Sequence, residues 1–285
     1  MTYREKYFAL QKIQNRYLNN SAIKELLMFD GNFNDFTALI KNFDNELNSE
    51  KDIDEKVERI IAGEPLQYVI GYAYFVNGRY KVTPSVFIPR QETEELAVSI
   101  MTRIVKMFGK DPKITIVDIG TGSGILAIYL KEYFPNARVI GIDISEEALE
   151  IARENASIHH VDIEFLQGNM LDPFKDKIDV IVSNPPYIGN KETVDEQTLK
   201  YEPHLALFAT PKTKYYEEIL THLDQMNDQY LIGFEIGEDM EDELTELLEK
   251  EYKGIGYSFK DDIYMKPRYL YIVKNKELDR YKFDA

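Results

Sequence analysis

Hydrophobic residues recur every three or four positions in the first part of the chain, which is the spacing of one face of a helix. Two sets of apolar residues each fall on one face of a predicted helix: Leu10, Ile13 and Tyr17, and then Ile53, Val57, Ile60 and Ile61. Asp52 is the predicted N-cap of the second helix and Gly63 its end. We therefore predict a helical domain over residues 1–65, which either docks a protein substrate or serves only as a folding appendage.

Farther along, short apolar runs alternate with amphipathic segments, a pattern typical of an α/β domain with a doubly wound parallel sheet. Strands are predicted at residues 114–119, 138–143, 162–167, 178–183, 230–236, 255–259 and 268–274. Helices are predicted at residues 124–133, 145–156, 213–224 and 238–250, and another one ends near Phe108. This pattern predicts a catalytic domain over residues 87–285.

Residues 66–86 are predicted to form a β-hairpin that links the two domains. Two β-rich runs between Gln67 and Val82 flank Asn77-Gly78. This dipeptide favours the positive φ angles of a type I′ turn, which joins antiparallel strands.

Composition and charge restrict the class of protein. The chain has 285 residues, of which 44% are hydrophobic, so it can fill a sizeable core. It has no apolar run long enough to span a membrane and no signal-peptide core at its polar start, so we expect a cytoplasmic protein without a membrane partner. The absence of cysteine excludes disulfides and thiolate catalysis. The four histidines are scattered apart from the adjacent pair His159-His160, so we predict no metal site. The net charge of −16 disfavours nucleic acid as a partner, and we expect a monomer.

A glycine-rich turn follows the first predicted strand of the catalytic domain. Gly120, Gly122 and Gly124 form a G-x-G-x-G pattern that is neither the dinucleotide fingerprint nor a P-loop. Glycines let the backbone approach a ligand, and Asp143, at the end of the next strand, can accept hydrogen bonds from ribose hydroxyls. With Asp118 before the turn, these residues resemble the class I S-adenosylmethionine-dependent methyltransferases. Asp118 is expected either to orient the turn or to reach the ammonium of the cofactor.

The tetrapeptide Asn184-Pro185-Pro186-Tyr187 follows the apolar run at residues 178–183. The amide oxygen of Asn184 and the carbonyl of Pro185 are two acceptors that can hold both hydrogens of a planar NH2 group, and Tyr187 can stack on that group. An asparagine and proline at a strand end also occur as an ordinary turn. The tetrapeptide resembles that of enzymes that methylate exocyclic or side-chain nitrogen.

Five blocks narrow the resemblance to the peptide chain release factor glutamine methyltransferases, over roughly residues 50–275. They are Gly63-Glu-Pro-Leu-Gln-Tyr68, Ile88-Pro-Arg-Gln-Glu-Thr-Glu94, Ser183-Asn-Pro-Pro-Tyr-Ile188, Tyr201-Glu-Pro203 with Ala206-Leu-Phe208, and Glu235-Ile-Gly237. The resemblance implies a seven-stranded Rossmann-like sheet whose last strand is antiparallel. It also implies methyl transfer from S-adenosylmethionine, leaving S-adenosylhomocysteine, to the side-chain nitrogen N5 of the glutamine in the Gly-Gly-Gln motif of class 1 release factors.

The same resemblance implies the residues of the site. The expected catalytic and substrate-binding residues are Asn184, Pro185, Pro186 and Tyr187. The expected cofactor-binding residues are Gly120, Thr121, Gly122, Ser123, Gly124, Asp143, Asn169, Met170 and Asn184.

The chain departs from the family pattern in two places. Gln91 follows Arg90 where members commonly have proline. Asn169-Met170 replaces the usual pair of an acid and an apolar residue. Asn169 would accept from the adenine amine through its neutral carbonyl. Met170 would either cover the adenine ring or be an ordinary core residue. Around the site, Arg90 and Glu92 either line the cofactor entrance or pair with each other, and Glu235 either supports the site or is a solvated or capping carboxylate.

Three other functions remain open from the sequence. A ribosomal protein could be the glutamine substrate, because the motifs barely separate the two substrates. A nucleic-acid base amine resembles an amide NH2, although the acidic charge and the absence of a basic cluster count against it. The third is a non-catalytic scaffold that binds the cofactor.

Overall fold

The structure is a computed structural model that describes residues 1–76 and 78–275. The chain forms two compact units. One comprises Met1–Tyr72 together with Asp195–Tyr201, and the other comprises the described residues of Ala73–Val194 and Glu202–Ala285.

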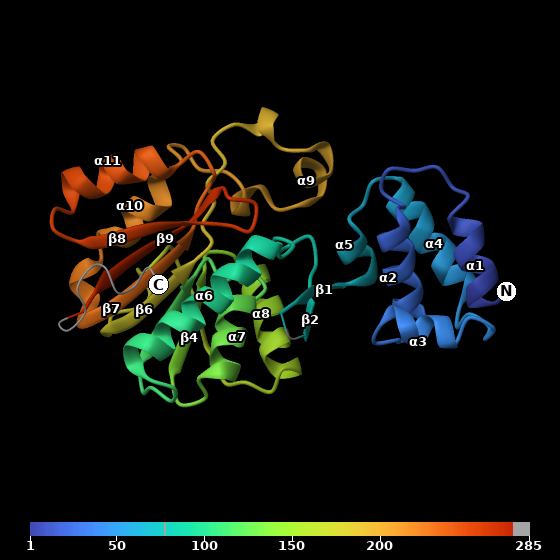
Figure 1. The fold of residues 1–285 in the computed structure, drawn as a ribbon, viewed down its shortest axis with the longest axis horizontal. Coiled ribbons are helices and arrows are strands. Elements are labelled where there is room, and N and C mark those ends of the chain that lie inside the picture. The colour runs from blue at the N-terminus through green and yellow to red at the C-terminus, as the bar shows by residue number, and fades with distance from the viewer. Residues whose placement is uncertain (77, 276–285) are drawn as a thin grey trace. The chain divides into compact units, whose positions relative to one another are not determined.

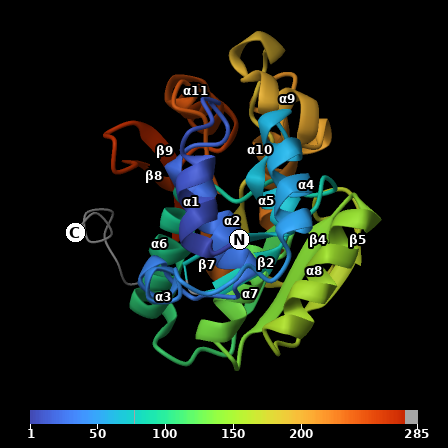
Figure 2. The ribbon, with the colours of Figure 1, turned by 90° about the vertical axis from the view of Figure 1, so that its right-hand side faces the viewer.

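The first unit is built from short helices, of which those near the N-terminus are drawn in blue in Figures 1 and 2 and one from farther along the chain is drawn in gold. They are α1 (Tyr3–Leu10), α2 (Asn20–Asp30), α3 (Phe36–Lys41), α4 (Glu50–Ile61) and α5 (Leu66–Ile70), with α9 (Glu196–Tyr201) contributed from far along the chain. Their core includes Tyr3, Ile23, Leu26, Leu27, Leu39, Ile53 and Ile60. Gln197 of α9 donates to the Gly63 carbonyl at 3.0 Å, which ties the distant segment to this unit.

Two details of the predicted helices are wrong. Helix α1 already ends at Leu10, so Ile13 does not continue its buried face and is 37% exposed. Ser49 rather than Asp52 caps α4, because the Ser49 hydroxyl accepts from the Asp52 backbone N–H at 3.2 Å. Asp52 lies in the first turn of α4, where a carboxylate faces the positive end of the helix dipole.

The predicted hairpin is shorter than its β-rich composition suggests. Residues 66–70 form helix α5, which ends at Gly71 with a φ of +80°. The sequence prediction of a strand from Gln67 was therefore wrong at its start, because Val69 and Ile70 pack into the helical core instead. Strands β1 (Tyr72–Phe75) and β2 (Gly78–Lys81) do pair, whereas the predicted Asn77-Gly78 turn includes a residue outside the described ones.

A seven-stranded sheet forms the centre of the second unit and confirms the predicted α/β fold. Its strands are β3 (Thr115–Ile119), β4 (Arg138–Asp143), β5 (Glu164–Gln167), β6 (Ile178–Ser183), β7 (Met226–Glu235), β8 (Gly256–Asp261) and β9 (Pro267–Lys274), in the order β5-β4-β3-β6-β7-β9-β8. The strands from β5 to β7 are parallel, and β9, the last one, is antiparallel to both of its neighbours.

Helices cover both faces of this sheet (Figure 1). One face packs against α6 (Gln91–Phe108), α7 (Ile125–Tyr133) and α8 (Glu146–Ile158), and the other against α10 (Lys214–Leu220) and α11 (Glu241–Glu251). Successive strand residues alternate between the two cores, as Ile116 and Val117 of β3 do. The apolar runs that the sequence shows are therefore strands buried on both faces.

The sheet has its topological switch point at β3, because β4 lies on one side of it and β6 on the other. Ligands of such sheets bind in the crevice at the carboxyl ends of the strands beside this point. The register pairs Ile119 of β3 with Ile142 of β4 and with Ser183 of β6. The segments that follow these three strands are therefore brought together.

Candidate active site

The glycine turn after β3 is held by a buried carboxylate. Gly120, Gly122 and Gly124 have φ angles of +69°, +55° and +81°, which glycine adopts without strain. One oxygen of Asp118 accepts from the Thr121 hydroxyl at 2.6 Å and from the Ala127 backbone N–H at 3.2 Å. The structure thus shows Asp118 orienting the turn. Burial raises the pKa of Asp118 to about 7, although these two hydrogen bonds act in the opposite direction.

Asp143 joins the end of β4 to the same turn. Its carboxylate accepts from the Gly122 backbone N–H and from the Ser145 backbone N–H, both at 2.9 Å. Burial raises the pKa of Asp143, and the backbone hydrogen bonds oppose that rise. A carboxylate has about four lone-pair sites, so Asp143 retains capacity to accept a further bond from a ligand hydroxyl.

Asn155 of α8 supports the glycine turn from behind, a role that the sequence analysis missed. Its fully buried amide donates to the Ser123 carbonyl at 2.8 Å and to the Lys81 carbonyl at 3.0 Å, and it accepts from the Lys81 N–H at 2.7 Å. The amide thus links β2 to the turn. Because its partners lie 32 and 74 residues away along the chain, nothing local in the sequence points to this role.

The Asn-Pro-Pro-Tyr turn leaves β6 beside the glycine turn. Ser183 fixes this strand end, since its hydroxyl donates to the Ile119 carbonyl of β3 at 2.6 Å. The Asn184 side-chain NH2 donates to the Thr93 hydroxyl at 3.0 Å, so the amide has its nitrogen turned toward α6. The Tyr187 hydroxyl donates to one oxygen of Glu235 at 3.3 Å.

Glu235 supports this turn, which was one of the two possibilities that the sequence left open. It is 1% exposed at the end of β7 and accepts from the Thr93 hydroxyl at 2.7 Å. Burial raises the pKa of Glu235 to about 7, while the hydrogen bonds from Thr93 and Tyr187 and the charge of Arg268 lower it. Burial and the charge of Glu235 both raise the pKa of Tyr187.

Asn169 and Met170 follow β5 and lie at the wall of the same pocket. Asn169 is exposed, and Met170, with a φ of +45°, packs in part against the core of the second unit. The position of Met170 is thus compatible both with covering the adenine ring and with a core role, because it packs against core residues and also lines the pocket.

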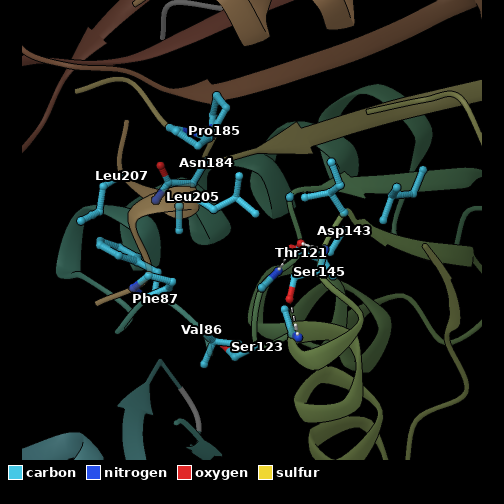
Figure 3. A pocket seen from close by; sticks show the side chains of 18 of the residues that line it. Val86, Phe87, Thr121, Ser123, Asp143, Ser145, Asn184, Pro185, Leu205 and Leu207 are labelled. Atoms are coloured by element: carbon cyan, nitrogen blue, oxygen red, sulfur yellow. Dashed lines mark hydrogen bonds between the residues drawn. The ribbon is translucent and has the colours of Figure 1, made fainter. Parts of the chain in front are cut away.

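One pocket brings all of these segments together (Figure 3). Every residue expected in the site lines it except Gly124, which packs against Ala152 of α8. In Figure 3, Asn184 and Pro185 lie across the cavity from Thr121 and Asp143. Most of the apolar wall was not predicted from the sequence; it includes Val86, Phe87, Leu205, Leu207 and Tyr215.

An ion pair between the partly exposed Arg90 and a buried carboxylate holds that apolar wall together. Arg90 pairs with Glu202, a carboxylate 5% exposed, and not with Glu92 as one sequence interpretation had it. The other oxygen of Glu202 accepts from the Ile88 backbone N–H at 3.2 Å, and the guanidinium of Arg90 lies 4.5 Å from the centre of the Phe87 ring. The segment before α6 is thereby fixed to the segment that contains Leu205.

Comparisons with known proteins identify the family. The model of the methyltransferase small domain matches residues 100–201. A release factor glutamine methyltransferase of Lactococcus lactis is 39% identical over 75% of this chain and 79% of its own length. The chain belongs to the release factor glutamine methyltransferase family. The member from Bacillus subtilis is 36% identical, over 77% of this chain and 80% of its own length.

Solved structures support the fold of this family member. The hMettl16 catalytic domain, solved in complex with the MAT2A 3′UTR hairpin 6, has a TM-score of 0.56 and covers 82% of this chain and 86% of that chain. At 12% identity, this likeness concerns the fold alone. Within residues 1–76 and 78–275, no helix is long and apolar enough to cross a membrane. The same residues contain no group of three or more His, Asp or Glu side chains that could hold a metal ion.

Proposed function

We propose that this enzyme transfers a methyl group from S-adenosylmethionine to the side-chain nitrogen of the glutamine in the Gly-Gly-Gln motif of class 1 release factors. The observation that carries the proposal is the Asn184 amide, which lines the pocket and donates its NH2 to Thr93, so that its oxygen would remain available to accept from a substrate. Membership in the release factor glutamine methyltransferase family supports the substrate.

The residues of the pocket fit the cofactor. A Cβ atom added to Gly120 or Gly122 would meet no atom of the described residues within 4 Å, so the turn borders open space. Backbone groups of residues 120–124 would contact the methionine part, and Asp143 would accept from the ribose hydroxyls. Asn169 would accept from the adenine amine, and Met170 would pack on the ring.

Asp118 has one further feature that suits a cationic ligand. Its second oxygen is buried and has no hydrogen-bond partner among the described residues. A bound ammonium nearby would favour the ionised form of this carboxylate and lower its pKa. We therefore expect Asp118 to orient the turn and also to respond to the charge of the cofactor.

The acceptors of the Asn-Pro-Pro-Tyr turn would act on the substrate amide. An amide nitrogen is a poor nucleophile because its lone pair is delocalised. The Asn184 oxygen and the Pro185 carbonyl would hold both of its hydrogens, which aims the nitrogen at the methyl group and favours the developing positive charge. S-adenosylmethionine supplies a methyl group on a sulfonium, and the N–C bond forms as the S–C bond breaks. The nitrogen then loses one proton to water.

Tyr187 and the apolar wall would complete the substrate site. The Tyr187 ring lines the pocket beside Asn184, and its hydroxyl is fixed by Glu235. Phe87, Leu205 and Leu207 would exclude water around the amide, which strengthens each hydrogen bond there. Positioning of this kind can contribute several of the roughly 7–11 kcal/mol available from orientation.

The test is a transfer assay with labelled S-adenosylmethionine and a purified class 1 release factor. The acceptors compared are the wild-type factor, its Gln→Ala variant in the Gly-Gly-Gln motif, a ribosomal protein and DNA. Label on the wild-type factor alone supports the proposal, and the Asn184→Ala enzyme is the control with strongly reduced activity. Label on the ribosomal protein or DNA instead would overturn the substrate, and absence of cofactor binding in calorimetry would overturn the enzyme assignment itself.

A further inference from the structure

Glu235 uses both of its carboxylate oxygens on the Asn-Pro-Pro-Tyr turn. One oxygen accepts from Thr93, which in turn accepts from Asn184, and the other accepts from Tyr187. A single buried side chain therefore reaches the first and last residues of the turn. Glu235 lies on β7 and Thr93 on α6, so two separate elements fix this geometry.

The direction of each hydrogen bond follows from the ionised carboxylate. An ionised Glu235 can only accept, so the Thr93 hydroxyl must donate its one proton to it. Thr93 then has only lone pairs left for Asn184, which must offer its NH2 group. The Asn184 oxygen is thereby turned away from Thr93 and remains available as an acceptor.

We infer that Glu235 and Thr93 are positioning residues that set the orientation of the Asn184 amide for methyl transfer. The inference rests on the proposed function, because it assumes that Asn184 holds a substrate NH2 group. An amide rotated by half a turn would present its own NH2 to the substrate NH2, and two donors cannot bond. The orientation of the Asn184 amide thus decides whether it can accept a hydrogen bond from the substrate NH2 group.

Protonation of Glu235 removes this directional constraint. A protonated carboxyl can donate to Thr93, whose hydroxyl can then donate to the Asn184 oxygen, so the amide is free to rotate. The titratable or charged groups facing Glu235 are Glu92 from α6, Tyr187 after β6, Tyr216 from α10, and Arg268 and Tyr269 from β9. Among them, Glu92 raises and Arg268 lowers the pKa of Glu235. Because that pKa is about 7, activity should fall as the pH falls through neutrality.

Substitutions at Thr93 separate orientation from folding. Thr93→Val keeps the shape but removes both hydrogen bonds, and we expect kcat to fall about 10- to 100-fold while the Kd of S-adenosylmethionine stays unchanged. Thr93→Ser retains the hydroxyl and should restore most of the activity. Thr102→Val is the matched control, because Thr102 lies on the same helix and its hydroxyl donates only to the Val98 carbonyl.

The pH profile gives a readout that a purely structural role would not change. Glu235→Gln can neither ionise nor fix the direction of the hydrogen bonds. Its kcat should therefore be low, and its pH profile should lack the fall in activity that the wild type shows below about pH 7. A Thr93→Val enzyme with wild-type kcat, or a Glu235→Gln enzyme with an unchanged acid limb, would overturn the inference.

A measurement without substrate keeps this inference distinct from the proposed function. The ¹⁵N side-chain signal of Asn184, assigned with the Asn184→Ala variant, should shift near pH 7 in the wild type and not in Glu235→Gln. If the wild type labels no release factor, the proposed function fails whatever this signal does. If the wild type is active but the Asn184 signal does not respond to pH or to Thr93→Val, the positioning inference fails alone.

Discussion

Gly122→Ala tests whether the glycine turn binds the cofactor. Gly122 has a φ of +55°, and an added Cβ would meet no atom of the described residues within 4 Å, so the alanine costs about 1 kcal/mol of folding stability from its backbone alone. Its methyl group would instead occupy open space beside the pocket, where the cofactor backbone contact is proposed. Pressing a methyl group against a bound ligand costs about 1–3 kcal/mol.

Since each 1.4 kcal/mol is about tenfold in Kd, we expect the Kd of S-adenosylmethionine to rise about 10- to 100-fold. Isothermal titration calorimetry measures the Kd, and thermal unfolding should show a decrease in Tm of about 2–4 °C. Gly254→Ala is the matched control, because Gly254 also has a positive φ, +86°, and open space around its Cβ, but it does not line the pocket. Wild-type affinity in Gly122→Ala, or equal loss of affinity in Gly254→Ala, would refute the reasoning.

Three further predictions concern turnover and stability. Asn184→Ala should lower methyl transfer about 100-fold in the radiometric assay without unfolding the protein, and unchanged turnover would rule out the proposed role of Asn184 in holding the substrate amide. Burial raises the pKa of Glu235 from 4.5 to about 7, so the folded protein binds the carboxyl proton more tightly than the unfolded protein does. The free energy of unfolding should therefore fall as the pH rises from 4.5 to 7, by up to about 3 kcal/mol. Urea unfolding of Glu235→Gln should show a smaller decrease, because buried Asp118 still contributes over the same pH range, and a decrease equal to that of the wild type would contradict the prediction. In Gly124→Ala the new Cβ would lie 3.1 Å from the Ala152 Cβ, and the alanine would have a strained φ of +81°. We therefore expect the free energy of unfolding, measured in urea, to fall by about 2–3 kcal/mol, and wild-type stability would be inconsistent with this contact.

Much of the fold followed from the sequence because the signals are local. The predicted strand at residues 178–183 coincides with β6, and the predicted strand at residues 138–143 coincides with β4. Both are short apolar runs bounded by polar residues, a pattern that strands buried on both faces require. Residues 66–70 form a helix despite their β-rich composition, because packing of Val69 and Ile70 into the helical core outweighs the weak propensity of a five-residue segment.

In the candidate site, too, residues with a local sequence signal could be predicted and residues that act over long distances in the chain could not. Gly120, Asp143 and Asn184 could be predicted from the sequence because each stands at the end of a predicted strand, and the structure places all three in one pocket. The residues that orient them were missed or left open, since Thr93 acts across 91 residues on Asn184 and Asn155 acts across 32 residues on Ser123. A hydrogen bond between distant residues leaves no periodic signal in a single sequence.

The sequence by itself predicted the succession of the seven strands and of the main helices that cover them along the second unit, the glycine turn and the proposed acceptors of the Asn-Pro-Pro-Tyr segment. These depend on backbone freedom, on residue chemistry and on the alternation of apolar and polar positions, all of which are local. Only the tertiary structure decided that Glu235 lies within hydrogen-bond reach of Thr93 and Tyr187, and that Arg90 pairs with Glu202 and not with Glu92. These pairings arise when the sheet and its helices pack, because burial makes an unpaired polar group costly and so selects the partners that the fold brings near.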